Sequence, residues 1–430
     1  MSFSPVLAGY RGAVAALGPF AGLWLDRRAR AGKEDAARLS ERYGYAARPR
    51  PDGALIWLHG ASVGESGVAL QLVEALAARN SGLNFLLTSG TRTSADLIAR
   101  RAPPQAVHVY APIDRADAVR RFMSHWRPDL GVFVESEMWP NLILEAQAAR
   151  VPLALVNARI SPASLGRLAR WPAAARQLLD AFALLLAADR RTADALSRLS
   201  GRTAPLVGNL KLAAPAPPVN AAAHAELAAQ IGARPVWLAA STHPGEDEIL
   251  LAAQHCVRES VPNALLIIAP RHPERGAAIA ASAGGAPRRA LRQEIGAADV
   301  YVADTLGELG VFYSLANVTF IAGSLLPEYK GHNPAEPARL GSAIVTGPYV
   351  ESFQDVFDAF AAADAALYAA NPNEIAAAIT SLWRDDAERA RLTEAARAIA
   401  ESGADALKQT VSQLVALAPA PKIGPADARA

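Results

Sequence analysis

The sequence contains a single cysteine, Cys256, so no disulfide bond can form within the chain, which fits a reducing compartment. It also lacks an excess of charge, and a net charge of +2 over 430 residues gives no sign of nucleic-acid binding. Its eight histidines show no paired ligand spacing such as HExxH, so we expect no metal site. Neither G-x-G-x-x-G after the first strand nor G-x-x-x-x-G-K-[ST] occurs, which disfavours a hydride-transfer enzyme and a P-loop ATPase.

A long unbroken apolar run is missing as well. The segment "GAVAALGPFAGLWL" (12–25) is interrupted by Gly18-Pro19, and a bilayer span needs about 20 apolar residues. The basic cluster "DRRARAGK" follows this segment, whereas a secretory signal carries its charge first. For residues 1–35 we therefore expect a membrane-associating segment at an anionic cytoplasmic leaflet, or else an ordinary helix docked on the protein.

The chain is otherwise rich in apolar residues (51%), and its length favours two domains. Short apolar runs alternate with alanine-rich helical stretches, a pattern typical of parallel sheets covered by helices on both faces. The predicted strands of the first half are residues 54–58, 83–88, 107–110, 130–134, 152–156, 182–187 and 205–207. Those of the second half are residues 236–240, 264–269, 299–302, 318–321, 343–346 and 366–368.

The two series are separated by residues 212–223, which are rich in proline and alanine and read as a linker. We therefore expect two doubly wound α/β domains, residues 36–212 and 213–418, and a loose tail, residues 419–430. Ligands of such sheets bind beyond the carboxyl ends of the strands. The loops that follow strands, around a cleft between the domains, should carry the chemistry.

The loop "HGASVGES" (59–66) follows the first predicted strand and leads into a helix expected to begin near Gly64. Glu65 would repel a phosphate there, and the helix start favours its ionised form, which a general base requires. A glutamate in a first helical turn is also an ordinary stabiliser, and on this loop alone that interpretation is stronger.

Polar side chains also follow the later strands of the first half. Glu135 and Glu137 come directly off a buried strand, on the same side of an extended chain. A lysine near them can hold a carboxylate or a phosphate, although a single basic residue is more often a surface charge. The amide and basic side chains expected at this edge are Asn157, Arg159, Asn209 and Lys211.

In the second half, "KGHNPAEPARLGSAIVTGP" (330–348) combines a glycine turn with a helix start, where backbone N–H groups can hold a phosphate and Glu336 can hold ribose hydroxyls. "IIAPRHPER" (267–275) places Arg271 at the rim, where it can bind an anion. A short capped helix is the alternative explanation for the first of these loops. Together they predict a nucleotide site in this half and an acid-bearing acceptor site in the other, the layout of a two-domain sugar-nucleotide glycosyltransferase.

Eight segments then identify a family: "ASVGE", "ESEMWPN", "NARIS", "GNLK", "STHPGEDE", "APRHPER", "GELGVFY" and "GHNPAEPA". Occurring in this order from about residue 38 to about residue 360, they resemble the Kdo (3-deoxy-D-manno-octulosonic acid) transferases of lipopolysaccharide assembly. The resemblance implies the GT-B fold, two facing Rossmann-like domains, with the acceptor in the first and CMP-Kdo in the second. It implies an inverting transfer of Kdo from CMP-Kdo to the lipid A precursor, with no metal and no cofactor, at the cytoplasmic side of the bacterial inner membrane.

The same resemblance assigns roles to residues. Glu65 matches the general base, and Glu135 and Lys211 match residues that stabilise the transition state. The expected CMP contacts are Pro270, Arg271, Leu306, Gly307, Glu308, Asn333, Pro334, Ala335 and Glu336. The expected contacts to the acceptor or to the donor's carboxylate are Ser62, Gly64, Glu137, Asn157 and Arg159. The family usually has glycine where this chain has Lys330 and Ala240.

Two other interpretations are consistent with paired Rossmann-like halves. One is a GT-B enzyme that uses a UDP-sugar, as a transferase or an epimerase. The other is a membrane-associated scaffold that kept the fold without catalysis. The pair "ESEMWPN" and "GHNPAEPA" favours the Kdo transferases over the first, and the joint presence of Glu65, Glu135 and Lys211 argues against the second.

Overall fold

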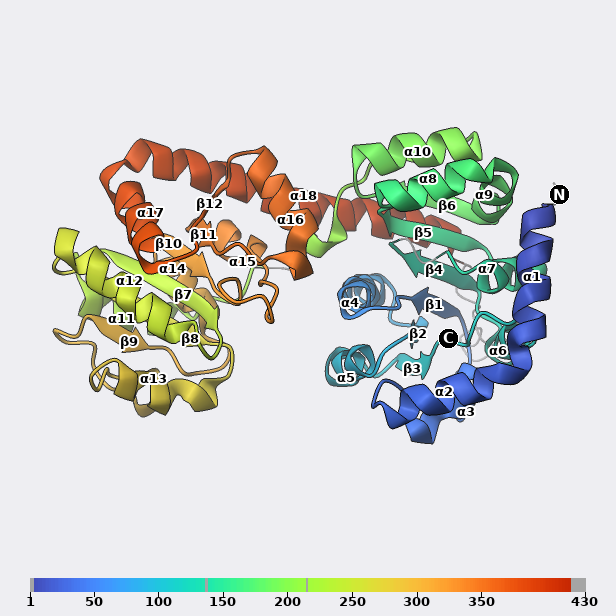
Figure 1. The fold of residues 1–430 in the computed structure, drawn as a ribbon, viewed down its shortest axis with the longest axis horizontal. Coiled ribbons are helices and arrows are strands. Elements are labelled where there is room, and N and C mark those ends of the chain that lie inside the picture. The colour runs from blue at the N-terminus through green and yellow to red at the C-terminus, as the bar shows by residue number, and fades with distance from the viewer. Residues whose placement is uncertain (1–3, 136–137, 214–215, 419–430) are drawn as a thin grey trace, which may run out of the picture. The chain divides into compact units, whose positions relative to one another are not determined.

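The computed structural model describes residues 4–135, 138–213 and 216–418 (Figure 1). The chain forms two compact units, one made of Met1–Lys211 with Asp405–Ala430 and the other of Leu212–Ala404. Each unit contains a six-stranded sheet in which all paired neighbours are parallel. The predicted α/β fold with two doubly wound sheets is confirmed.

The sheet of the first unit has the order β3-β2-β1-β4-β5-β6, so the winding reverses between β1 and β4. Alternate residues of β1 enter different cores, Leu55 and Trp57 on one face and Ile56 and Leu58 on the other, as expected for a strand buried on both sides. The strands are β1 (Leu55–His59), β2 (Asn84–Ser89), β3 (Ala106–Tyr110), β4 (Leu130–Val134), β5 (Leu153–Ala158) and β6 (Phe182–Ala187).

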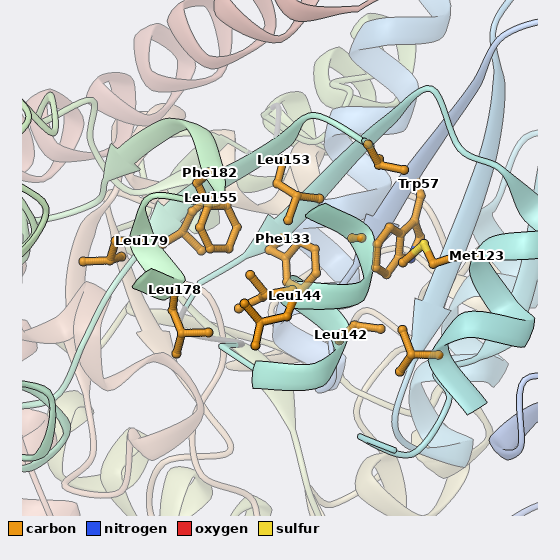
Figure 2. Close-up of a cluster of buried hydrophobic side chains, with 14 of the residues drawn as sticks. Trp57, Met123, Phe133, Leu142, Leu144, Leu153, Leu155, Leu178, Leu179 and Phe182 are labelled. Carbon is orange, nitrogen blue, oxygen red and sulfur yellow. The ribbon is translucent and has the colours of Figure 1, made fainter. Parts of the chain in front are cut away.

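Helices pack on both faces of this sheet, and Figure 2 shows the buried hydrophobic side chains of the core on one of them. Trp57 and Phe133, from the neighbouring strands β1 and β4, meet edge to face with ring centroids 5.1 Å apart. The helices are α1 (Pro5–Leu17), α2 (Ala21–Arg30), α3 (Leu39–Arg42), α4 (Val63–Arg79), α5 (Arg92–Arg101), α6 (Ala116–Trp126), α7 (Pro140–Ala148), α8 (Pro162–Arg170), α9 (Pro172–Leu179) and α10 (Arg190–Ser200).

The second unit repeats this plan. Its sheet has the order β12-β11-β10-β7-β8-β9 and reverses its winding between β7 and β10. The strands are β7 (Val236–Thr242), β8 (Leu265–Pro270), β9 (Val300–Val302), β10 (Val318–Ile321), β11 (Ala343–Thr346) and β12 (Ala366–Tyr368). The helices are α11 (Ala221–Ile231), α12 (Asp247–Ser260), α13 (Gly276–Ser282), α14 (Leu309–Leu315), α15 (Ala335–Arg339), α16 (Gln354–Ala362), α17 (Pro372–Arg384) and α18 (Asp386–Leu417).

Three segments differ from the expectations. Residues 205–207 form only an isolated bridge between Leu206 and Ala187 instead of a strand, because Pro205 has no N–H to donate to a ladder. The linker is partly helical, since the 3-10 turn Leu210–Ala213 extends into its start and α11 begins within it at Ala221. The end of α18 belongs to the first unit and not the second, because Ala406, Val411 and Leu414 are buried in a core with β1 and β2.

The N-terminal segment, Pro5–Arg30, is a helical stretch long and apolar enough by composition to cross a membrane, although only 11% of its most apolar window is buried. Gly18-Pro19 produces a short 3-10 turn between α1 and α2 rather than a break. The segment is also docked on the first unit, since Ser4 N donates to Gln177 Oε1 (3.0 Å) and Arg115 Nη1 donates to Gly18 O (3.0 Å).

Candidate functional site

Glu65 lies in the first turn of α4, just beyond the end of β1. Its carboxylate Oε2 accepts from Ala61 N (2.5 Å) and Ser62 N (3.2 Å), and its own N–H donates to Ser62 Oγ (3.3 Å). This is a capping box, which stabilises the helix start and also fixes the orientation of the carboxylate. The residue is 8% exposed, so it is nearly enclosed without being sealed from solvent.

Glu135 is the first residue after β4, the strand beside β1. Its backbone has a φ of 63°, an uncommon left-handed conformation for a glutamate, and its N–H donates to Val156 O (2.9 Å). Its Oε1 lies 2.9 Å from Lys211 Nζ, and both side chains retain some exposure. The sequence therefore correctly placed an acid and a lysine at one edge of the sheet, and the structure joins them in an ion pair.

This ion pair lies against the start of α4. A Cβ built on Gly64 would be 3.7 Å from Lys211 Cε and 4.0 Å from Lys211 Nζ. The site therefore forms where β1 and β4 diverge, which is where open α/β sheets bind ligands. Three of the predicted residues, Gly64, Glu135 and Lys211, are brought together here, with Glu65 next to Gly64 in the chain.

The remaining predicted residues of this unit have different places. Asn157, with a φ of 52°, accepts from Leu210 N through its Oδ1 (2.8 Å) and so holds the segment that carries Lys211. Asn209 Oδ1 accepts from Lys211 N (3.0 Å) in the same segment. Arg159 follows the end of β5 and is partly buried. Glu137 lies outside the described residues.

In the second unit, Pro270 ends β8 and Arg271 follows it at the surface. Glu336 lies in the first turn of α15, where burial raises the pKa of its carboxyl group while the positive charges of Arg271 and Arg339 oppose that shift. Asn333 Oδ1 accepts from Ala335 N (3.0 Å) at the start of the same helix, beside the buried Pro334. The structure therefore brings Arg271 close to the loop 333–336.

The other predicted donor residues follow β9. Glu308 forms an ion pair with Arg289 (Oε1 to Nη2, 2.8 Å) and accepts from Thr305 Oγ1 (2.6 Å), and the hydrogen bond with Arg289 lowers the pKa of Glu308. Gly307 has a φ of 83°, and Leu306 is 83% exposed. Arg289, Thr305 and Glu308 line a pocket of about 480 Å³ together with Glu226, Ala290 and Arg292.

Sequence reasoning missed a cluster of aromatic rings at Tyr329 and His332, just before the loop 333–336. His243 Nε2 lies 2.9 Å from His332 Nε2, and the His243 ring stacks on Tyr329 with centroids 4.1 Å apart. Burial lowers the pKa of each histidine to about 4. Two signals were available, because helix capping explains neither His243 in "STHPGEDE" nor Gly331 and His332 in "GHNPAEPA".

Two other residues of the second unit are unusual, Lys330 in its backbone conformation and Glu246 in the burial of its side chain. Lys330 has a φ of 61°, which explains why glycine is usual at this position in the family that the sequence resembles. Glu246 is fully buried and accepts hydrogen bonds from backbone N–H groups, another feature that the sequence did not reveal. Among the described residues, no group of three or more histidine, cysteine or acidic side chains is placed to hold a metal ion.

Comparison with known proteins adds to this geometry. Residues 37–214 match the family model described as 3-deoxy-D-manno-octulosonic-acid transferase (kdotransferase). The 3-deoxy-D-manno-octulosonic acid transferase of Rickettsia bellii is 34% identical over 330 residues, which cover 76% of this chain and 78% of that protein. The enzyme of the same name from Bordetella pertussis is 33% identical over 425 residues, covering 94% of this chain and 98% of that protein.

Solved structures show a likeness of fold. A putative UDP-N-acetylglucosamine 2-epimerase from Listeria monocytogenes superposes with a TM-score of 0.52 and 13% identity, covering 85% of this chain and 96% of that chain. A glycosyltransferase from Rickettsia africae superposes with a TM-score of 0.51 and 10% identity, over 85% of this chain and 99% of that one. At such identities the likeness extends to the architecture alone.

Proposed function

Because the chain belongs to the 3-deoxy-D-manno-octulosonic acid (Kdo) transferases and has the GT-B fold, we propose that it moves Kdo from CMP-Kdo to the lipid A precursor, with inversion and without a metal ion. The observation that carries the proposal is the Glu135–Lys211 ion pair lying against the helix start that presents Glu65. Glu65, Glu135 and Lys211 thus supply a base, a second carboxylate and a cation at one end of the first sheet.

Glu65 is the general base of the proposed reaction. The acceptor hydroxyl is a poor nucleophile, so Glu65 takes its proton while the oxygen attacks the anomeric carbon of Kdo. The bond from that carbon to the phosphate oxygen of CMP breaks in the same displacement, which inverts the centre. The amides of Ala61 and Ser62 hold the carboxylate in one orientation, so little freedom is lost when the acceptor binds.

Glu135 and Lys211 stabilise the charges that develop. The sugar becomes oxocarbenium-like as its bond to phosphate breaks, and the Glu135 carboxylate favours that positive charge. Lys211 neutralises either the carboxylate of Kdo or the departing phosphate. In the structure the two side chains neutralise each other, so donor binding gives each of them a new partner.

The donor nucleotide is proposed to bind the second unit. Arg271 is exposed and available to a phosphate, and Glu336 lies beside it with a carboxylate that suits ribose hydroxyls. Glu308 is held by Arg289 and Thr305 in a single orientation, ready to accept hydrogen bonds from the nucleotide. The backbone of residues 333–335 completes the set.

The proposed location is the cytoplasmic face of the inner membrane. Large apolar side chains are at least half exposed along α1, the 3-10 turn and α2: Leu17 (65%), Phe20 (65%), Leu23 (73%) and Trp24 (50%). Basic residues occupy the last turn of α2, where they suit anionic lipid head groups. Burying such an apolar face at a membrane surface removes it from water.

Two measurements test the proposal. The protein is incubated with CMP-Kdo and an acylated lipid A precursor, and mass spectrometry is expected to show the acceptor gaining the mass of Kdo. Calorimetry is expected to show tighter binding of CMP than of UDP. An acceptor of unchanged mass, or a clear preference for UDP, would contradict the assignment in favour of a UDP-sugar enzyme of the same fold.

A further inference from the structure

We propose that two adjoining apolar pockets of the first unit form a channel that binds one acyl chain of the lipid acceptor and leads it to Glu65. The inference rests on the proposed function, because it concerns how that acceptor is recognised. The proposed acyl-chain site lies between α1, α2 and the loop that follows β3.

The two pockets share part of their lining. The outer pocket, of about 480 Å³, is bounded by α1 and α2 and includes Val14 and Phe20. The inner pocket, of about 170 Å³, reaches Ala61. Trp24, Ile113 and Asp114 line both, so the pockets adjoin.

The inner pocket reaches the loop that holds the proposed base. Ala61 lines it, and the backbone N–H of Ala61 donates to Glu65 Oε2 at 2.5 Å. The outer pocket opens among the exposed side chains of Leu17 and Phe20. A chain lying in both pockets would therefore run from the apolar surface of the N-terminal helices to the loop that holds Glu65.

Polar residues in the wall of the inner pocket have partners within the protein, and His59 Nδ1 lies 2.9 Å from Thr88 Oγ1. Burial, helped by the positive charge of Arg42, lowers the pKa of His59 to about 3, so its ring is neutral at pH 7. The Arg42 guanidinium donates to Ala111 O and pairs with Glu34.

Asp114, at the junction of the pockets, is compensated in the same way. Its carboxylate accepts from Tyr10 Oη (2.7 Å), Asn141 N (3.2 Å) and Leu142 N (2.8 Å). A polar ligand would have to displace these bonds, whereas an apolar chain would leave them intact. The lining therefore selects a hydrocarbon chain.

Charge and position favour the acceptor over a bulk membrane lipid as the occupant. Arg27 and Arg30 end α2, the helix that also carries Trp24 of the outer pocket, and suit the phosphates of a phosphorylated, acylated disaccharide, whereas Arg28 pairs with Glu34 and lies over the Trp24 ring. A lipid with no sugar would gain nothing from a channel that ends beside Glu65. An acceptor whose chain occupies the channel has its sugar held close to the base.

The test compares two acceptors in detergent solution, without a bilayer: the acylated lipid A precursor and the same disaccharide with its acyl chains removed and its phosphates retained. Trp24→Ala removes a wall common to both pockets and changes a half-exposed residue, so the fold should survive. We expect KM for the acylated acceptor to rise about tenfold, the effect of losing roughly 1.4 kcal/mol of binding. KM for the deacylated acceptor should stay within about twofold of wild type, well inside that 1.4 kcal/mol.

Trp171→Ala is the matched control, because Trp171 is 53% exposed against 50% for Trp24 and lines neither pocket. It should leave KM for both acceptors unchanged. Equal KM changes for the two acceptors with Trp24→Ala, or the same loss with Trp171→Ala, would overturn the channel while leaving the transferase activity established. If the wild-type protein used neither acceptor, the proposed function itself would be refuted.

Discussion

Glu65 and Glu246 occupy equivalent places in the two units, since each follows the first strand of its sheet and stands at the start of the next helix. Glu65 accepts from two N–H groups of its own loop. Glu246 accepts from His243 N and from three consecutive N–H groups of the loop after β10, at 2.7–3.0 Å. One carboxylate is oriented locally, and the other ties two loops together.

The loops after β4 and β10, which lie beside these carboxylates, also differ in what they contribute. In the first unit the loop after β4 contributes the side chain of Glu135, which pairs with Lys211. In the second unit the equivalent loop contributes backbone N–H groups to Glu246, which is completely buried. Glu246 therefore has a structural role at the switch point of the second unit, whereas Glu65, at the equivalent place in the first unit, is the carboxylate that we propose to be the base.

The largest expected effect is on the rate of Kdo transfer, and it distinguishes the role of Glu65 from that of Glu246. Glu65→Ala should lower the rate of Kdo transfer by about 10²–10⁴-fold, because the acceptor hydroxyl loses its base. CMP binding, measured by calorimetry, should survive. Thr91→Ala is the control, since it weakens a helix cap, that of α5, but keeps the Glu65 carboxylate. Wild-type turnover in Glu65→Ala would remove Glu65 as the base.

Glu246→Ala should reduce stability instead of chemistry. The substitution leaves four backbone N–H groups without their acceptor in a buried position, and we expect a loss of about 3 kcal/mol in the free energy of unfolding. Denaturant unfolding measures the change. Glu65→Ala, which removes only a helix cap, should cost about 1 kcal/mol. Similar costs for the two variants would abolish the distinction between the carboxylates.

Ion pairs extend the comparison to smaller effects. The Glu135–Lys211 ion pair should act on the rate, so Glu135→Gln and Lys211→Met should show a coupling of about 1–2 kcal/mol in kcat/KM when the single variants are compared with the double variant.

Arg289→Met breaks the Arg289–Glu308 ion pair of the second unit and should weaken CMP binding while leaving kcat unchanged. A fall in kcat with Arg289→Met would contradict this division of labour.

The smallest effect concerns pH. The pKa of His332 is lowered from 6.5 to about 4, so its stabilising contribution is present above pH 6.5 and is lost as pH falls toward 4. Between pH 6.5 and 5.5 the second unit should lose about 1 kcal/mol or less for this histidine. Hydrogen exchange in the second unit measures it. His332→Asn should flatten the dependence, whereas the exposed His255→Asn should not.

Much of the local structure could be read from the sequence. The strands at residues 130–134, 182–187 and 318–321 occur at the predicted positions, and α4 begins one residue from the expected Gly64. These features depend on apolar runs, turn residues and caps that neighbours in the chain determine among themselves. The order of eight short motifs identified the family in the same way, because each motif is local.

The sequence alone therefore determined the two α/β units, their strands and the family. Only the tertiary structure decided that Lys211 lies beside both Gly64 and Glu135 and that His243 contacts His332. It also decided that the Glu246 carboxylate accepts hydrogen bonds from the loop after β10. It also placed the end of α18 in the first unit and left a pocket of about 170 Å³ beside Ala61. Those contacts join residues far apart in the chain, and they depend on strand order and helix packing, which local periodicity does not encode.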